Sequence, residues 1–195
     1  MYIREIEKDE LNNFVNNHPL GSIYQTYEYN QVQINLGYDV LYLGFFIDDE
    51  LKGTASILVK KVDGYKYGYI RRGFLTDFNN LNLISSFANT LVSYLGKLNI
   101  IGIKLSLPII KEDSLKYNYL FEHLIANDFY HFGYNNYFEA LDPRFEAIIS
   151  LEDEYINIVK NLKKSLKNRI KQAEEKNVKL FRTDGKKINY IYNQT

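Results

Sequence analysis

The chain has 195 residues, of which 46% are hydrophobic and 25% charged, a composition typical of a globular protein. It contains no cysteine, which excludes disulfides and thiolate metal sites, and no apolar run approaches the ~20 residues of a membrane-spanning helix. The opening segment is charged from Arg4 onward and lacks the apolar core of a signal peptide. We therefore expect a cytoplasmic protein.

The net charge is zero, but it is unevenly distributed along the chain. Residues 1–150 contain 13 basic and 18 acidic side chains, whereas residues 151–195 contain 11 basic and 6 acidic ones. A cationic segment suits a phosphate-bearing ligand, such as a tRNA, a nucleotide or an anionic lipid head group.

The first part of the chain predicts two short helices followed by three antiparallel strands. The helices are indicated by apolar residues at steps of three or four, and the strands by apolar runs separated by turn residues. Asp63-Gly64 is a strong hairpin signal between the second and third strands. These elements are expected over residues 7–15, 26–36, 40–47, 51–62 and 65–71.

The rest of the chain alternates helices and strands. Helices are expected over residues 81–98 and 114–126, on either side of a buried strand over 99–105. Two strands, one long helix and a final strand follow, over residues 129–138, 145–151, 154–176 and 178–181.

The order of these elements predicts an α/β fold in residues 1–150. It is a mixed sheet flanked by helices, in the layout of an acetyltransferase-like (GNAT) domain. Residues 151–195 are expected to open a second, incomplete GNAT-like unit, because their helix and strand have no partner element among themselves.

The loop Tyr69–Asp77, between a strand and a helix, is the first candidate site. Loops in that position often line sites in α/β sheets, and Arg71 and Arg72 beside Gly73 suit a phosphate or a carboxylate. The alternative is an ordinary connecting loop in which Asp77 caps the following helix.

Two further segments are candidates. The helix over residues 154–176 combines an apolar stripe with a basic surface, which suits contact with a phosphate backbone, or else is a solvated face. The segment Gly21–Tyr29 enters a helix with aromatic residues at two-residue spacing, or else packs the core. The basic residues of the predicted helix over 154–176 are Lys160, Lys163, Lys164, Lys167, Arg169 and Lys171.

Several enzyme classes lack support in the sequence. The three histidines, at positions 18, 123 and 131, show no metal-ligand spacing. No phosphate-binding P-loop, dinucleotide fingerprint or nucleophile elbow occurs, and the sequence identifies no catalytic residue. The Gly-rich turn with which acetyltransferases of this layout hold coenzyme A is also absent, so acetyl-CoA is not the expected donor. We expect no metal and no cofactor.

Four segments resemble motifs of the Fem (FemABX) family of non-ribosomal peptidyl transferases, in the family's order. Gly21–Tyr29 is similar to the element G-x-x-x-Q-(S/T)-x-x-W, with Tyr29 in place of tryptophan. Gly68–Asp77 is similar to YIPRGP-x-x-D, and Ile103–Pro108 to a strand ending near K-x-D-P. Lys163–Val178 is similar to KKTRYNIRKAEKKGV, which is the most specific match because residue types and spacing agree throughout.

The resemblance implies an aminoacyltransferase that moves an amino acid from aminoacyl-tRNA to the stem peptide of a lipid-linked or UDP-linked peptidoglycan precursor. The resemblance implies no cofactor besides the donor tRNA. It is also compatible with a peripheral contact with the inner membrane face and with a homologous partner subunit. Because the ester is already activated, the enzyme needs to position the amine and stabilise an oxyanion, without a nucleophile of its own. The residues that the resemblance places in substrate binding are Gln25, Tyr29, Arg71, Arg72, Asp77, Lys164, Lys167 and Arg169.

The chain departs from the family pattern at several motif positions. Two prolines, one acidic residue, one lysine and one arginine are replaced, and Lys167 keeps the charge of the arginine without its bidentate fork. The chain also matches only about the first half of the family's usual length. A non-catalytic, truncated relative that acts as a binding or scaffold domain therefore remains an alternative, and a small-molecule N-acyltransferase that binds acetyl-CoA is a third hypothesis. The departures are at Gln31, Arg71, Phe74, Ser106, Leu107 and Lys167.

Overall fold

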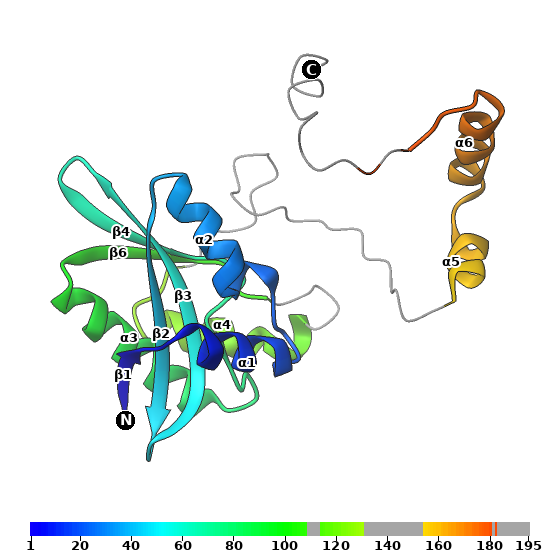
Figure 1. The fold of residues 1–195 in the computed structure, drawn as a ribbon. Coiled ribbons are helices and arrows are strands. Elements are labelled where there is room, and N and C mark those ends of the chain that lie inside the picture. Colours follow the sequence, from blue (N-terminus) through cyan, green and yellow to red (C-terminus); the bar gives the residue numbers. More distant parts are fainter. Residues whose placement is uncertain (109–113, 131–153, 181, 183–195) are drawn as a thin grey trace. The chain divides into compact units, whose positions relative to one another are not determined.

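The computed structural model describes residues 1–108, 114–130, 154–180 and 182 (Figure 1). The chain divides into two compact units, Met1–Arg144 and Phe145–Thr195, and each is described by itself. None of the helices in these described ranges has the length and hydropathy required to cross a bilayer.

A mixed sheet forms the centre of the first unit (Figure 1). Among the described residues the strand order is β1-β2-β3-β4-β6, and β5 pairs with β3 outside this path. All neighbours are antiparallel except β4 and β6, which are parallel. The strands are β1 (Tyr2–Glu5), β2 (Asp39–Ile47), β3 (Glu50–Val62), β4 (Tyr65–Ile70), β5 (Leu75–Thr76) and β6 (Ile100–Leu105).

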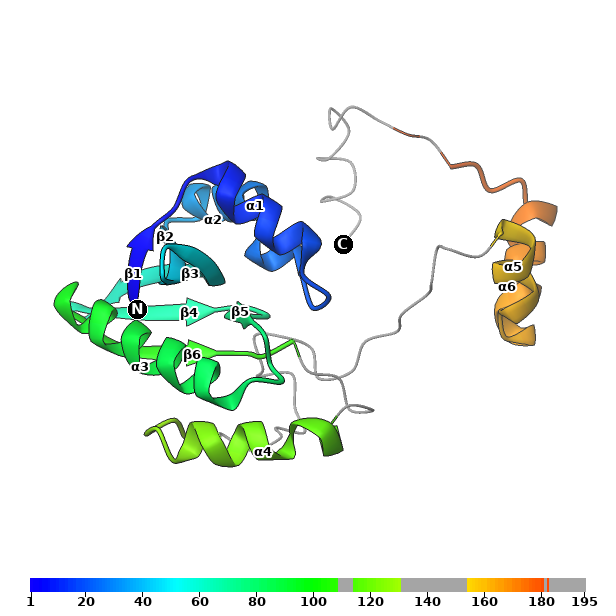
Figure 2. The same cartoon turned by 90° about the horizontal axis from the view of Figure 1, so that it is seen from below.

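Helices cover both faces of the sheet (Figure 2). Helix α1 (Lys8–Asn17) and helix α2 (Tyr27–Asn35) lie on one face, and the 3-10 helix η1 (Ile23–Gln25) connects them. Helix α3 (Leu81–Lys97) and helix α4 (Ser114–Ile125) lie on the other face. Helix α3 is part of the crossover to β6, since a parallel pair cannot be joined by a tight turn. This arrangement confirms the predicted α/β fold class, a GNAT-like mixed sheet flanked by helices.

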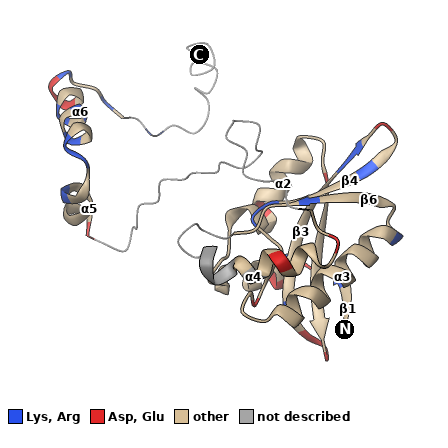
Figure 3. Ribbon diagram, turned by 180° about the vertical axis from the view of Figure 1, so that it is seen from behind, with Lys and Arg blue, Asp and Glu red and all other residues tan. Residues whose placement is uncertain are grey.

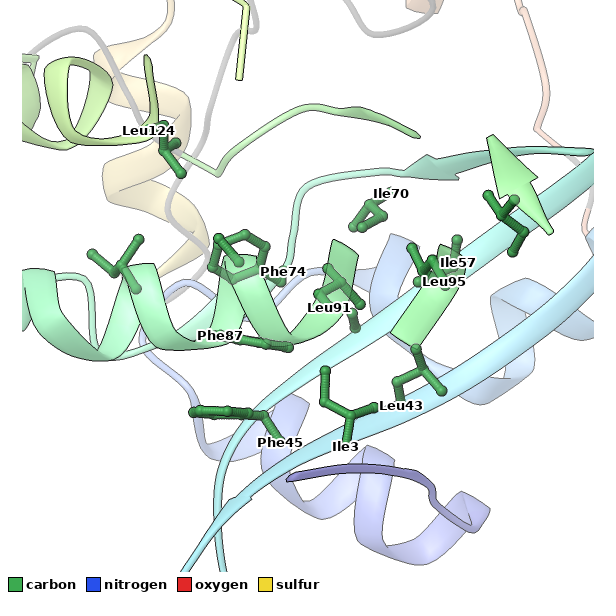
Figure 4. Packing of buried hydrophobic residues seen from close by; sticks show 14 of the residues in the cluster. Ile3, Leu43, Phe45, Ile57, Ile70, Phe74, Phe87, Leu91, Leu95 and Leu124 are labelled. Atoms are coloured by element: carbon green, nitrogen blue, oxygen red, sulfur yellow. The ribbon is translucent and has the colours of Figure 1, made fainter. Parts of the chain in front are cut away.

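The larger core lies between the sheet and α3 (Figure 4). The residues Phe87, Leu91 and Leu95 follow one face of α3 at steps of four and are almost completely buried. Phe87 stacks on Phe45 of β2 with 4.9 Å between the ring centroids. Burying one such side chain stabilises the fold by roughly 1.5–3 kcal/mol. A smaller cluster on the opposite face contains Ile6, Leu11, Val15, Phe46 and Leu75.

Two tight turns set the register of β2, β3 and β4. Asp63 and Gly64 have φ angles of 50° and 88°, and Asp48 and Asp49 have φ angles of 48° and 61°. Positive φ at both central residues is the signature of a type I′ hairpin turn. The predicted turn at Asp63-Gly64 is therefore confirmed.

The predicted helices and strands between residues 7 and 126 are confirmed, with ends that differ by at most two residues. Two strands were not predicted. Strand β1 has four residues with a single buried side chain, Ile3, and β5 has only two residues, so neither shows an alternating pattern. Of the predicted strand 129–138, Phe129 and Tyr130 lie outside any strand. The rest of it, and the predicted strand 145–151, lie outside the described residues.

The prediction of one long helix over 154–176 is wrong. The segment forms two helices, α5 (Tyr155–Asn161) and α6 (Lys164–Glu175). They are separated at Leu162 and Lys163, whose extended ψ angles of 142° and 143° interrupt the helical backbone. Hydrophobic spacing does not report such a break, because the apolar stripe continues on both sides of it.

The predicted final strand is also wrong in its described part. Residues 178–180 follow α6 without forming a strand, and residue 181 lies outside the described residues. That this second unit opens another GNAT-like domain stays a prediction.

Candidate functional site

Gln25 joins two segments that are distant in the sequence. Its side-chain Oε1 accepts a hydrogen bond from the Ser56 backbone N–H at 2.9 Å, and its Nε2 donates to the Arg71 carbonyl at 2.6 Å and to the Ser56 carbonyl at 3.4 Å. The Ser56 hydroxyl donates to the Gln25 carbonyl at 2.7 Å. Gln25 is fully buried, so the structure places this predicted substrate-binding residue behind the loop that begins at Arg71.

The loop Arg71–Gly73 is held from the other side by Ser106, which follows β6. The Arg72 N–H donates to the Ser106 hydroxyl, and the Gly73 N–H donates to the Ser106 carbonyl, both at 3.0 Å. A Cβ atom at position 73 would lie 2.6 Å from the Gln25 side chain, so a larger residue there would displace the Gln25 amide or the loop. Ser106 stands near the position where the related motif has an acidic residue, and here it shapes the loop.

Arg71 lies between two tyrosines. Its guanidinium carbon is 4.1 Å from the ring centroid of Tyr24 and 5.8 Å from that of Tyr29, and its Nη1 donates to the Tyr29 hydroxyl. The two rings meet edge to face at 5.0 Å. All three side chains are half-buried. The structure thus brings together Tyr29 and Arg71, two predicted site residues from separate motifs, and adds Tyr24 to them.

Short-range hydrogen bonds fix the two tyrosines. The Thr26 hydroxyl caps α2 by accepting from the Tyr29 N–H at 3.4 Å, and the Ser22 hydroxyl accepts from the Tyr24 N–H at the same distance. The buried side chain of Asn30 donates to the carbonyls of Tyr24 at 3.1 Å and Thr26 at 2.7 Å. Local capping therefore sets the positions of the rings that contact Arg71.

Asp77 is exposed, and its side chain makes hydrogen bonds within the turn that it begins. Its Oδ1 accepts from the backbone N–H and the side-chain amide of Asn79, at 2.9 and 3.0 Å. The residue that caps α3 is Asn80, whose side chain accepts from the Leu83 N–H at 3.1 Å. The alternative interpretation of Asp77 as the helix cap is therefore wrong.

His18 connects the end of α1 to the strand β5. Its Nδ1 accepts from the Leu20 N–H at 3.1 Å, and its Nε2 lies 3.0 Å from the Thr76 carbonyl. These partners assign the neutral tautomer with the proton on Nε2. A shallow surface depression of about 380 Å³ opens beside His18, and its lining includes Gly21 and Thr26 but not Arg71.

The three predicted basic residues Lys164, Lys167 and Arg169 lie exposed on α6, in the second unit. Lys167 Nζ donates to the carbonyl of Lys160 at 2.7 Å, which satisfies a backbone acceptor in the last turn of α5. On the same helix, Leu166 and Ile170 are each 43% exposed, so the apolar stripe is only partly covered within this unit.

One polar cluster was missed in the sequence. The Ser85 hydroxyl of α3 hydrogen-bonds to His123 Nε2 of α4, and Asn127 donates to Ser85 Oγ at 3.3 Å and to the His123 carbonyl at 2.8 Å. The cluster ties α4 to α3, and a separation of 38 residues hides it from motif searches. Among the residues that the structure describes, no group of three or more His, Cys, Asp or Glu side chains is placed to hold a metal ion.

Comparison with known proteins gives one family. A model of the FemAB family matches residues 6–190. The lipid II:glycine glycyltransferase of Staphylococcus saprophyticus is 23% identical over 175 residues, which are 88% of this chain and 41% of that protein. The enzyme of the same name from Staphylococcus aureus is 23% identical over 188 residues, 94% of this chain and 43% of that protein.

A solved structure shares the fold. The crystal structure of FemX superposes with a TM-score of 0.61 at 24% identity, over 69% of this chain and 33% of that chain. The chain spans less than half the length of the curated relatives that it matches.

Proposed function

Since the chain belongs to the FemAB family, we propose that it takes part in aminoacyl transfer to the stem peptide of a peptidoglycan precursor. The donor in this proposal is aminoacyl-tRNA, no other cofactor is used, and the reaction takes place in the cytoplasm. The names of the two staphylococcal relatives support a lipid-linked acceptor, and a UDP-linked precursor carries the same stem peptide and a comparable diphosphate.

The observation that carries the proposal is the fixed position of Arg71. Tyr24 and Tyr29 hold the guanidinium in place, while Gln25 and Ser106 fix the loop beneath it. A guanidinium that is already oriented loses little conformational entropy when it binds a phosphate or carboxylate, and its planar fork matches either anion. Arg71 therefore suits the diphosphate or a carboxylate of the precursor.

The other predicted residues have supporting roles in this proposal. Gln25 acts by positioning the Arg71 loop, because it is fully buried. Arg72 and Asp77 contribute to the shape of the acceptor site from the same loop. Lys164, Lys167 and Arg169 contact phosphates of the precursor or of the tRNA. Catalysis then consists of holding the acceptor amine against an activated ester and stabilising the oxyanion that develops.

Precursor binding tests the role of Arg71. Calorimetry with the UDP-linked precursor is expected to show a loss of affinity of roughly tenfold or more for Arg71→Ala, because a charge-assisted hydrogen bond contributes about 1.5–3 kcal/mol. Arg71→Lys restores only part of the affinity, since it keeps the charge but loses the fork. Lys97→Ala, an exposed cation at the end of α3, is the matched control. Equal affinities for wild type and Arg71→Ala would contradict the assignment.

A double variant tests the basic helix. Lys167→Ala with Arg169→Ala is expected to weaken binding of the precursor or of tRNA and to flatten the dependence of that binding on salt, because fewer counterions are released. The pair Lys176→Ala with Lys179→Ala removes the same charge just after α6 and serves as the control. If the variant with Lys167→Ala and Arg169→Ala binds precursor and tRNA as tightly as the wild type, these two residues are not part of the binding site.

The transfer reaction separates the proposal from its alternatives. Mass spectrometry of the precursor, after incubation with the chain and aminoacyl-tRNA, is expected to show the addition of an amino-acid residue. Binding of precursor without transfer supports the alternative of a non-catalytic binding or scaffold domain. Binding of acetyl-CoA by calorimetry would instead favour a small-molecule N-acyltransferase.

A further inference from the structure

One face of β4 carries tyrosines at alternate positions. Gly68 and Ile70 point into the core, where a Cβ atom at Gly68 would contact the side chains of Ile57 and Ile103. Because successive side chains of a strand point to opposite faces, Tyr65, Tyr67 and Tyr69 share the other face. Tyr65 is 57% exposed and Tyr67 is 44% exposed.

Two lysines join this face from the neighbouring strands. Lys60 of β3 is paired with Tyr67, and Lys104 of β6 is paired with Tyr69, so their side chains lie on the same face as the tyrosines. Both lysines are exposed, and Figure 3 shows a basic segment on β6, the strand of Lys104. We call Lys60, Tyr65, Tyr67, Tyr69 and Lys104 the tyrosine face.

Gly102 of β6 lies beside the ring of Tyr67. Gly102 is paired with Tyr67, and a Cβ atom at Gly102 would lie 3.5 Å from Tyr67 Cδ1. The Tyr67 ring therefore lies towards β6, within ordinary contact distance of a side chain at position 102. With 44% of its surface exposed, Tyr67 is accessible to a planar ligand.

The tyrosine face is locally cationic although residues 1–150 are acidic as a whole. None of the five residues of the tyrosine face is acidic. The nearest acidic residue along the hairpin is Asp63, which lies in the turn between β3 and β4. The main sheet contacts of helix α2 are with β2 and β3, and Tyr65 and Tyr67 of β4 are exposed (Figure 2).

The tyrosine face leads to the candidate site. Arg71 follows Tyr69 by two residues and so continues the alternation on the same face. It contacts Tyr24 of η1 and Tyr29 of α2, and both helices lie on this side of the sheet. From Tyr65 to Arg71 the strand advances by about 20 Å. A ligand that lies along the face thus ends beside Arg71.

We infer that the tyrosine face binds a single-stranded nucleic-acid end, with bases stacked on the tyrosine rings and phosphates beside Lys60 and Lys104. Aromatic rings on a sheet and nearby cations are the two elements with which proteins bind single strands. The identification of that strand as the acceptor end of the donor tRNA rests on the proposed function. The aminoacyl ester then reaches the Arg71 loop.

Fluorescence anisotropy with a labelled single-stranded RNA of about eight nucleotides tests the inference. Tyr67→Ala is expected to weaken binding roughly 5- to 150-fold, as the loss of one stacked base does, and Tyr67→Phe to retain most of the affinity. Tyr130→Ala, which removes a tyrosine that is 86% exposed elsewhere in the unit, is the matched control. A duplex of the same sequence is expected to bind more weakly than the single strand, because its bases are already stacked.

The lysines are tested by salt dependence. Lys60→Ala with Lys104→Ala is expected to lower the slope of log affinity against log salt by about 1.4, since each phosphate contact to a single strand contributes about 0.7. Lys61→Ala with Lys97→Ala is the charge-matched control outside the tyrosine face.

Separate outcomes distinguish this inference from the proposed function. If transfer occurs but Tyr67→Ala changes neither RNA affinity nor the KM for aminoacyl-tRNA, the inference is wrong and the proposed function stands. If RNA binding depends on Tyr67 but no transfer occurs, the tyrosine face stands without the proposed function. If Tyr67→Ala weakens binding to vesicles with anionic lipid and leaves RNA binding unchanged, the face is a membrane contact and the inference is overturned.

Discussion

Gln25 and Ser56 hold each other through three hydrogen bonds, although 31 residues separate them in the sequence. The Gln25 amide accepts from the Ser56 N–H and donates to its carbonyl, and the Ser56 hydroxyl donates to the Gln25 backbone. The same amide nitrogen donates to the Arg71 carbonyl at 2.6 Å. One buried side chain thus connects η1, the centre of β3 and the candidate loop.

Gln25→Ala is expected to lower the free energy of unfolding by about 1–3 kcal/mol for each buried backbone group that loses its partner. The variant should also increase hydrogen exchange in the loop Arg71–Gly73. Gln31→Ala is the matched control, because Gln31 is only half-buried and its amide donates to the hydroxyl of Tyr42. If urea unfolding gives equal midpoints for the two variants, the Gln25 contacts stabilise the fold no more than the Gln31 contact does.

Gly73→Ala and Gly96→Ala are expected to have opposite effects on stability. A methyl group at position 73 lies 2.6 Å from the Gln25 side chain, and such overpacking typically costs 1–3 kcal/mol. At position 96, near the end of α3, no atom lies within 4 Å of the added methyl group, and alanine gains up to ~1 kcal/mol as the better helix former. Thermal unfolding of both variants measures the difference, and a stable Gly73→Ala variant would place the Gln25 side chain elsewhere.

The contact between Glu28 and Lys8 predicts a loss of stability in acid. Lys8 Nζ lies 2.7 Å from Glu28 Oε1, and Asn12 donates to Glu28 Oε2 at 2.8 Å. The hydrogen bond from Lys8, followed by that from Asn12, lowers the pKa of Glu28 from 4.5 to about 2. Because the folded pKa is the lower one, this stabilisation is present above pH 4.5 and is lost as the pH falls towards 2.

Glu28→Gln is expected to remove this part of the pH dependence. In urea unfolding at stepped pH, wild type and variant should differ most above pH 4.5 and converge as the pH approaches 2. Lys8→Met removes the partner and should flatten the profile in the same range. A stability difference between wild type and Glu28→Gln that stays constant down to pH 2 would exclude the contact as its cause.

Lys163→Asp is expected to stabilise α6. Lys163 is the N-cap of this helix but makes no side-chain capping hydrogen bond, and its positive charge lies at the positive end of the helix dipole. An aspartate there caps the helix and reverses the unfavourable charge, for a gain of about 1 kcal/mol. Hydrogen exchange of residues 164–175 should become several-fold slower. Lys176→Asp, at the other end of the helix, should make it faster, and the same response in both variants would contradict the argument.

The sequence predicted the helices and strands of residues 7–126 because each has a strong local pattern. The steps of three and four along α3 and the Asp63-Gly64 turn signal are properties of neighbouring residues. The break at Leu162–Lys163 depends on two backbone angles within a continuous apolar stripe, so no side-chain pattern marks it. Strand β1 depends on its partner β2, to which it is paired from Tyr2 to Glu5, rather than on its own composition.

The site could be predicted only in part. The motifs identified Tyr29 and Arg71, which the structure brings into contact. They did not show that Gln25 is buried against Ser56, nor that Gln25 and Ser106 hold the loop, because those contacts span 31 to 46 residues and require the assembled sheet. Single polar residues such as serine give no sequence signal for a partner on another strand.

The parallel pairing of β4 with β6 has a consequence for the growing polypeptide on the ribosome. The edge of β4 that β6 later covers has no partner until Leu105 has been synthesised, which at 5–20 residues per second takes roughly 2–7 s after Ile70. During that interval a tyrosine-rich strand exposes its backbone donors and acceptors, the condition under which nascent chains associate. Lys66, in the second position of β4, is a charged residue of the kind that limits such association.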